Sequence, residues 1–159
     1  MIDHAKNKEI GMRYGTIFGK RPDILAYPRD ILELTLQNLN SPNWEPTKAI
    51  SFHASEEIWE NPLEISSNLT KKDFDELRIG WDLVLDIDCP DWEISKITTY
   101  LFIKALRDNG VKDVTCKFSG NKGMHIGVPF ESFPKEVAGK LTKDIFPDGP
   151  KKIAIYLLH

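Results

Sequence analysis

Two aspartates, Asp86 and Asp88, close an apolar stretch over 81–88 that has the alternation of a β-strand. Carboxylates at positions i and i+2 of a strand project from the same face, close enough together to share or bridge divalent cations. Nothing in the adjacent sequence neutralises the pair. The spacing alone also fits the solvent-facing edge of a half-buried strand, which is the commoner origin of such a pair. Asp82 belongs to the same face but lies too far along the strand to join the site, and we expect it at the surface.

A glycine-rich turn, SGNKGMH, runs from Ser119 to His125. Gly120 and Gly123 permit positive φ and close approach of the backbone to a ligand, and successive N–H groups in such a turn can form an anion-binding concavity. Ser119 adds a hydroxyl, Lys122 a point charge and His125 a ring donor for phosphate oxygen. A glycine-rich hairpin with a surface lysine explains the turn equally well when it is taken alone.

The elements around these two motifs predict how they meet. After the strand over 81–88, Asp91 is placed to cap a helix that ends at Asn109-Gly110. Strands follow over 111–118 and 124–128. We expect the first two strands to pair in parallel through a right-handed crossover, which brings the turn near the carboxylates. The apolar positions at helical spacing are Ile94, Ile97, Leu101 and Ala105.

Shorter elements are predicted elsewhere, so the fold class is α/β (α+β), with a mixed sheet flanked by helices. Thr70 and Asp73 form a capping-box pair, and Pro150 lies in a favoured first turn. The elements are a helix over 29–38, a strand over 48–53, a turn over 55–59, a short polar helix within 70–80, and closing helices over 134–145 and 150–158.

Composition sets outer bounds without naming a function. The chain has 159 residues, 41% hydrophobic and 28% charged, which suits one globular domain over 1–159. No apolar run reaches the roughly 20 residues of a membrane span, so we expect no membrane partner and a cytoplasmic protein. A net charge of −3 neither favours nor excludes nucleic acid. Cys89 and Cys116 form no metal-ligand set with the four histidines.

The two motifs together resemble a known family. WDLVLDIDCPDW followed by KFSGNKGMHIGVPF resembles the first and second catalytic motifs of archaeo-eukaryotic primase small subunits: a strand ending in DxD, a helix, then a strand ending in SGxxGxH. The resemblance is strongest over 81–130. Weaker similarity covers the family's early R-E-F-x-F segment at 8–12, a stretch of archaeal members at 52–65, and later helices at 134–159.

This resemblance implies a DNA primase-type nucleotidyltransferase, which synthesises primers for DNA replication on a single-stranded DNA template from nucleoside triphosphates. Asp86 and Asp88 match the carboxylates that hold a pair of catalytic cations, magnesium or manganese. Ser119 and His125, with the glycines between them, match the residues that bind the triphosphate. Lys122 keeps one basic residue of the family's turn.

Several positions match the family less well. Asn121 stands where members often carry a basic residue, which puts the triphosphate affinity in doubt. Glu9 matches an early acidic position, although a surface glutamate explains it better. Arg29 is better explained as a helix-start residue than as a site residue. His53 is expected to pack or cap locally.

Two parts of the family's site are not found in this sequence. The third carboxylate, expected on a later strand, has no match, because Asp144 and Asp148 lie at the ends of helix-like segments and are not assigned. No Cys/His cluster supplies the zinc-binding insert. We therefore expect the N-terminal part of a longer catalytic subunit, or a reduced relative that obtains the rest from a partner such as a large primase subunit.

Two other functions stay open. The first is a non-catalytic nucleotide- or nucleic-acid-binding module on the same fold. The second is a metal-dependent nuclease, which would also use paired aspartates. The SGxxGxH turn argues against the nuclease, because a nuclease needs no triphosphate pocket.

Overall fold

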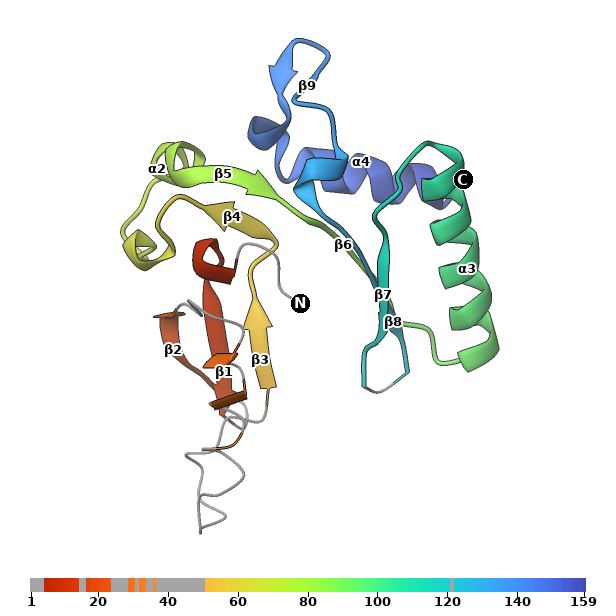
Figure 1. The fold of residues 1–159 in the computed structure, drawn as a ribbon, viewed down its shortest axis with the longest axis horizontal. Helices are drawn as coiled ribbons and strands as arrows, with labels where there is room; N and C mark the ends of the chain where they lie inside the picture. Colours follow the sequence, from red (N-terminus) through yellow and green to blue (C-terminus); the bar gives the residue numbers. More distant parts are fainter. Residues whose placement is uncertain are drawn as a thin grey trace. The chain divides into compact units, whose positions relative to one another are not determined.

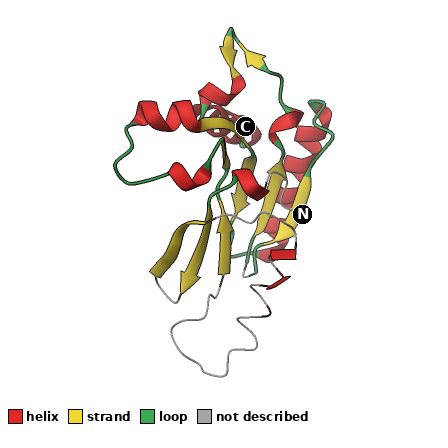
Figure 2. Cartoon of the chain, turned by 60° about the vertical axis from the view of Figure 1, so that its left-hand side comes forward, coloured by secondary structure: helices red, strands yellow, loops and turns green. Residues whose placement is uncertain are grey.

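The computed structural model describes residues 5–14, 17–23, 29–30, 32–33, 36, 51–120 and 122–159. The chain divides into two compact units, Met1–Ile79 and Gly80–His159 (Figure 1). Both contain helices and strands, which confirms the mixed α and β character expected from the sequence (Figure 2). No helix among the described residues is long and apolar enough to cross a membrane.

The first unit is built on an antiparallel sheet with the strand order β2-β1-β3. The strand expected over 48–53 is β3, described from Ser51, and the stretch over 55–59 contains a short strand, β4, where a turn was expected. A two-stranded sheet joins β4 and β5. The elements are η1 (Ala5–Asn7), β1 (Ile10–Tyr14), β2 (Ile17–Asp23), β3 (Ser51–Ala54), β4 (Glu57–Trp59), η2 (Pro62–Glu64), α2 (Lys71–Leu77) and β5 (Arg78–Trp81).

The capping box at the start of α2 is confirmed. The Thr70 hydroxyl accepts the N–H of Asp73, and the Asp73 carboxylate accepts the N–H of Thr70. The Thr70 hydroxyl also donates to the Asp73 carboxylate, and this bond, followed by that from the Thr70 N–H, holds the pKa of Asp73 below its ordinary value. Most of the helix expected over 29–38 lies outside the described residues; the positions that are described there are helical.

The second unit holds both chemical motifs. Its main sheet has the order β6-β8-β7, and β8 pairs antiparallel with both neighbours. The turn expected after residue 118 therefore joins a β-hairpin of β7 and β8. The elements are β6 (Leu83–Ile87), α3 (Trp92–Asp108), β7 (Thr115–Phe118), β8 (Met124–Val128), η3 (Phe130–Ser132), β9 (Glu136–Val137), β10 (Lys140–Leu141), η4 (Thr142–Ile145) and α4 (Asp148–Leu157).

The expected parallel pairing of β6 with β7 is wrong, because β8 lies between them. Both outer strands run antiparallel to β8 and so share a direction without sharing hydrogen bonds. The packing explains the order: Ile126 and Val128 of β8 are fully buried, whereas every residue of β7 is exposed. The more apolar strand takes the central position, and the polar strand becomes an edge.

One face of this sheet carries the core of the unit. Leu83, Leu85 and Ile87 alternate with exposed residues along β6, as the sequence predicted. Helices α3 and α4 both contact β6, and α3 runs along the sheet in Figures 1 and 2. The core also takes in Trp81, Leu106, Ile126 and Val128 and the partly buried Phe102, Ile103, Phe130, Phe133, Phe146, Ile153 and Leu157.

The face that α3 buries is not the one expected. Its boundaries are as predicted, with Asp91 accepting the N–H groups of Glu93 and Ile94. However, Ile94 is exposed, as are Ile97 and Leu101, while Ser95, Thr99 and Leu106 are buried. The helix is apolar on more than one side, so periodicity alone did not identify the buried stripe.

The helix predicted over 134–145 is also wrong. This stretch forms the β9–β10 hairpin followed by η4, whereas α4 closely matches the helix predicted over 150–158. Ala138 and Gly139, at φ 50° and 77°, turn the chain between the two short strands. Val137 and Leu141, which are four residues apart, imitate a helical spacing. Positive φ at consecutive residues is incompatible with a helix and typical of tight hairpins.

Candidate functional site

The DxD strand and the SGxxGxH turn meet at neighbouring positions of the sheet. Asp86 of β6 lies directly opposite His125 of β8, and His125 lies opposite Lys117 of β7. The His125 Nε2 is 3.3 Å from the Asp86 Oδ1. The Asp86 side chain is 65% exposed and that of His125 is 30% exposed. One cross-strand row therefore presents a carboxylate, an imidazole and an ammonium group beside one another.

Buried neighbours fix this row. Leu85 and Ile87, on either side of Asp86, are buried in the core, and so is Ile126 beside His125. Because successive strand residues face opposite sides, burying these side chains turns Asp86 and His125 outward. The core thus sets the orientation of the candidate site.

Backbone bonds close the glycine-rich turn. The N–H of Ser119 donates to the carbonyl of Gly123 at 2.9 Å, and the N–H of Gly123 donates to the Ser119 hydroxyl oxygen at 3.1 Å. Gly120 has a φ of +100°, so its positive φ is as expected. The turn uses the N–H groups of Ser119 and Gly123 internally. Among the described residues of the turn, Ser119 and Lys122 also carry side-chain donors, a hydroxyl and an ammonium group.

Gly123 has a role that the sequence analysis did not assign. A Cβ on this residue would overlap the carbonyl oxygen of Ile87, and would lie 3.1 Å from the Ile87 carbonyl carbon and 3.3 Å from the Asp88 Cα. Its backbone approaches the end of β6, where a ligand was expected. This close approach brings the turn against Asp88, the first residue after the strand.

Ser95 is a second residue that sequence reasoning missed. Its side chain is fully buried in the first turn of α3, and its hydroxyl is 3.3 Å from the carbonyl oxygens of both Cys89 and Lys122. One hydroxyl thus connects the helix to the chain after the DxD motif and to the turn. The sequence offers no local signal for this role, because Ser95 lies between Ile94 and Lys96 like any polar helix residue.

Four other residues that the sequence singled out make contacts of their own outside the DxD and SGxxGxH motifs. Asp82 is half-buried, where a surface position was expected, and its carboxylate accepts the N–H of Phe130 at 3.0 Å. In the first unit, the N–H of Glu9 donates to the Ser55 hydroxyl. Arg29 forms an exposed i,i+4 ion pair with Glu33, and His53 hydrogen-bonds with Ser51.

The described residues contain no group of three or more His, Cys, Asp or Glu side chains arranged to hold a metal ion. Of the acids left unassigned by the sequence, Asp144 forms an ion pair with Lys143 at 2.7 Å, and Asp148 is the exposed first residue of α4.

Comparison with known proteins adds one relative. No family model matches the chain. The chain is 39% identical over 61 residues to MJECS07, an uncharacterized protein of Methanocaldococcus jannaschii. The match covers 38% of this chain and 14% of that protein, so it spans a small part of the relative. The similarity names no activity.

Proposed function

We propose that this chain carries the metal- and nucleotide-binding core of a DNA-dependent nucleotidyltransferase of the archaeo-eukaryotic primase type. The observation that supports the proposal most strongly is the pairing of Asp86 with His125, at 3.3 Å between Nε2 and Oδ1. Residues of the two separate motifs become cross-strand neighbours on an exposed face. Metal carboxylates next to a phosphate-binding turn are the parts needed for nucleotidyl transfer.

The residues present fit a divalent cation. Carboxylate oxygens are the ligands that magnesium and manganese prefer, and both Asp86 and Asp88 are open to solvent. The cations supply charge neutralisation on the triphosphate and activation of the attacking hydroxyl. Among the described residues, no third metal-ligating side chain joins these two carboxylates. The site therefore keeps open positions for phosphate oxygens and water.

The glycine-rich turn and the strand after it supply the groups that bind the triphosphate. His125 and the Ser119 hydroxyl donate to phosphate oxygens, and the Lys122 ammonium adds a positive charge at the exposed tip. Because the turn is closed by its own hydrogen bonds, the Ser119 hydroxyl is held in place before the nucleotide arrives. Preorganised donors stabilise developing charge more effectively than donors that must first be ordered.

In the proposed reaction, the 3′-hydroxyl of a primer or first nucleotide attacks the α-phosphate of the bound triphosphate in line. The bond from the α-phosphorus to the new oxygen forms as the bond to the bridging oxygen breaks, the hydroxyl proton passes to water, and pyrophosphate leaves. The protein orients the reactants and balances charge, so the mechanism requires no covalent nucleophile. A single-stranded DNA template would select the nucleotide by base pairing.

Manganese binding tests the metal half of this proposal. The double variant Asp86→Ala/Asp88→Ala should lose manganese binding by calorimetry, because it removes both proposed ligands. The matched control is Asp113→Ala/Glu136→Ala, which removes the same charge at exposed positions away from the motifs. Equal manganese affinity of wild type and the first double variant would contradict the assignment.

Nucleotide incorporation separates the enzyme from the non-catalytic module. Primed and unprimed single-stranded DNA should be incubated with manganese and labelled nucleoside triphosphate. With two of the three carboxylates that the family resemblance calls for, we expect weak but Asp86-dependent incorporation, orders of magnitude below that of a protein with all three. Each loss of about 1.4 kcal/mol in transition-state stabilisation is tenfold in rate. Triphosphate binding without incorporation would favour the module, and degradation of the DNA would favour the nuclease.

A further inference from the structure

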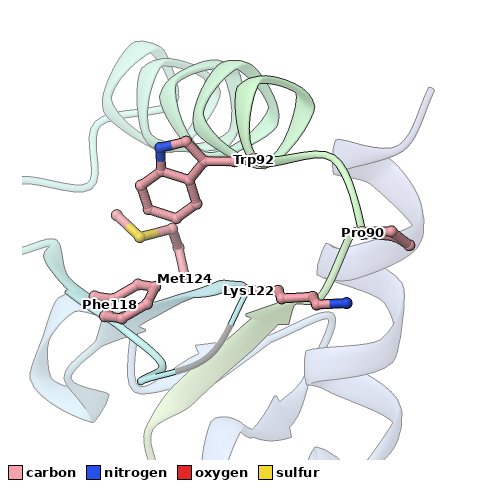
Figure 3. A pocket seen from close by; sticks show the side chains of 5 residues that line it. All are labelled: Pro90, Trp92, Phe118, Lys122 and Met124. Atoms are coloured by element: carbon pink, nitrogen blue, oxygen red, sulfur yellow. The ribbon is translucent and has the colours of Figure 1, made fainter.

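A pocket of about 500 Å³ opens at the start of α3, beside the glycine-rich turn (Figure 3). Its volume lies in the range of roughly 300–1,000 Å³ that holds small ligands. Its walls come from the segment after β6, the first residue of α3, the end of β7, the turn and the start of β8. The lining residues are Pro90, Trp92, Phe118, Lys122 and Met124.

Two aromatic rings lie in contact with each other in the wall of this pocket. The rings of Trp92 and Phe118 meet edge to face, with centroids 5.5 Å apart and planes at 89°. The two residues are 43% and 51% exposed. Figure 3 shows the Met124 side chain reaching from the strand toward the Trp92 ring. Exposed aromatic faces above a polarisable thioether offer stacking area to a flat ligand.

The charges at the pocket favour an anionic ligand. Lys122 is the charged residue among those that line it, and in Figure 3 its side chain extends on the Pro90 side of the pocket. A second cation, Lys96, lies 5.9 Å from the centre of the Trp92 ring. Of the acids near the pocket, Glu93 pairs with Lys96 at 2.7 Å and Asp91 caps α3, whereas Asp88 is exposed and is one of the two proposed metal ligands.

The pocket also lies next to the proposed nucleotide site in the sheet. Ile87, Met124 and Phe118 form one cross-strand row, and Asp86, His125 and Lys117 form the adjacent row. Adjacent rows face opposite sides of a sheet, so the two sites are separated by the strand ends and the 119–123 turn. A chain of nucleotides that passes over this turn would contact both.

We propose that this pocket stacks one base of a single-stranded nucleic acid, with a flanking phosphate bound by Lys122, a residue of the turn that the pocket shares with the proposed triphosphate site. The inference rests on the proposed function for the adjacent site and assigns its template or primer contact. An apolar peptide could fill the same volume, but it would not use the lysine that lines it. A base joined to a phosphate matches both the aromatic walls and the charge.

The test is the affinity of the chain for a labelled oligo-dT of about 15 nucleotides, measured by fluorescence anisotropy in EDTA. Trp92→Ala and Phe118→Ala should each weaken binding roughly five- to hundred-fold, the range of one lost base–aromatic stack. Trp92→Phe keeps an aromatic face and should bind close to wild type. Tyr156→Ala, at an exposed tyrosine of α4, is the matched control and should change nothing.

Two further arms identify the ligand chemistry. An abasic oligomer of equal length should bind wild type as weakly as oligo-dT binds the Trp92→Ala variant. Lys122→Ala should reduce the slope of log affinity against log salt by about 0.7, the value for one phosphate contact on a single strand. Equal binding of the abasic oligomer and oligo-dT would overturn the base-stacking site.

The outcome is separable from that of the proposed function. If Trp92→Ala, still folded by circular dichroism, binds oligo-dT like wild type while Asp86→Ala/Asp88→Ala loses manganese, the stacking site is wrong and the metal site stands. If oligo-dT binding depends on Trp92 and Phe118 while manganese affinity ignores both aspartates, the stacking site stands and the nucleotidyltransferase proposal fails.

Discussion

Substitution of Gly123 by alanine should damage both the fold and the candidate site. The new Cβ would overlap the Ile87 carbonyl oxygen and lie 3.3 Å from the Asp88 Cα. Both neighbours are backbone atoms of the paired strand, so relief requires β6 and β8 to separate. Overpacking costs about 1–3 kcal/mol, and a clash with backbone belongs at the upper end of that range. The alanine also reduces unfolded-chain entropy, which offsets about 0.4–1 kcal/mol. The expected net loss is about 2 kcal/mol.

The matched control is Gly127, which lies on β8, the strand that follows the turn. A Cβ at Gly127 would meet the Thr115 hydroxyl at 2.7 Å, which is a side-chain atom that can rotate away. Gly127→Ala loses the hydrogen bond from that hydroxyl to the Gly127 carbonyl, worth about 1 kcal/mol, and gains a similar amount from unfolded-chain entropy. Its net effect should be near zero.

Urea denaturation followed by tryptophan fluorescence measures the stability of both variants, and calorimetry measures their manganese affinity. Gly123→Ala should lower the unfolding free energy and weaken manganese binding, since the separation of β6 from β8 moves Asp88. Gly127→Ala should leave both quantities close to wild type. If Gly123→Ala were as stable as wild type, the close approach of the turn to β6 would be wrong.

Three further substitutions test other parts of the molecule. His125→Ala should weaken nucleoside triphosphate binding roughly tenfold or more, because a hydrogen bond to a charged group contributes about 1.5–3 kcal/mol; equal affinity by calorimetry would remove His125 from the site. Ser95→Ala should cost about 1 kcal/mol in urea and weaken triphosphate binding with manganese affinity retained, because the turn loses its bond from α3; unchanged triphosphate affinity would restrict Ser95 to packing. Burial, followed by the charge of Glu57, raises the pKa of Glu56, so its ionised form opposes folding. Glu56→Gln should therefore be more stable than wild type at pH 7, and the difference should vanish as the pH falls below the ordinary Glu value of 4.5; a constant difference down to pH 3 would contradict this reasoning.

The sequence by itself determined the local elements around the two motifs. The alternation of Leu83, Leu85 and Ile87 identified β6 because a half-buried strand has a period of two. Asp91 and Gly110 bounded α3, since capping side chains and positive-φ glycines act within a few residues. The chemical types in DxD and SGxxGxH identified the candidate site for the same reason: each motif is contiguous.

Where interacting residues are distant in sequence, only the tertiary structure determined which of them lie together. The central position of β8 places His125 opposite Asp86. This position depends on the burial of Ile126 and Val128, two residues of β8, in the core of the unit. The sequence pattern shows that β8 is more apolar than β7, but it does not specify which of the two strands pairs with β6. The same applies to the buried stripe of α3, because a helix with apolar residues on several sides buries the one that its neighbours can cover.

The two residues that hold the turn in place were also decided in three dimensions. Gly123 resembles any turn glycine until the Ile87 carbonyl is placed against it. Ser95 resembles a polar helix residue until its hydroxyl is found between the Cys89 and Lys122 carbonyls. Both act through contacts with segments that are separated from them in sequence, and such contacts exist only after the sheet and helix have packed. The sequence therefore determined which groups could do chemistry, and the packing of β6, β8 and α3 determined which of them lie together.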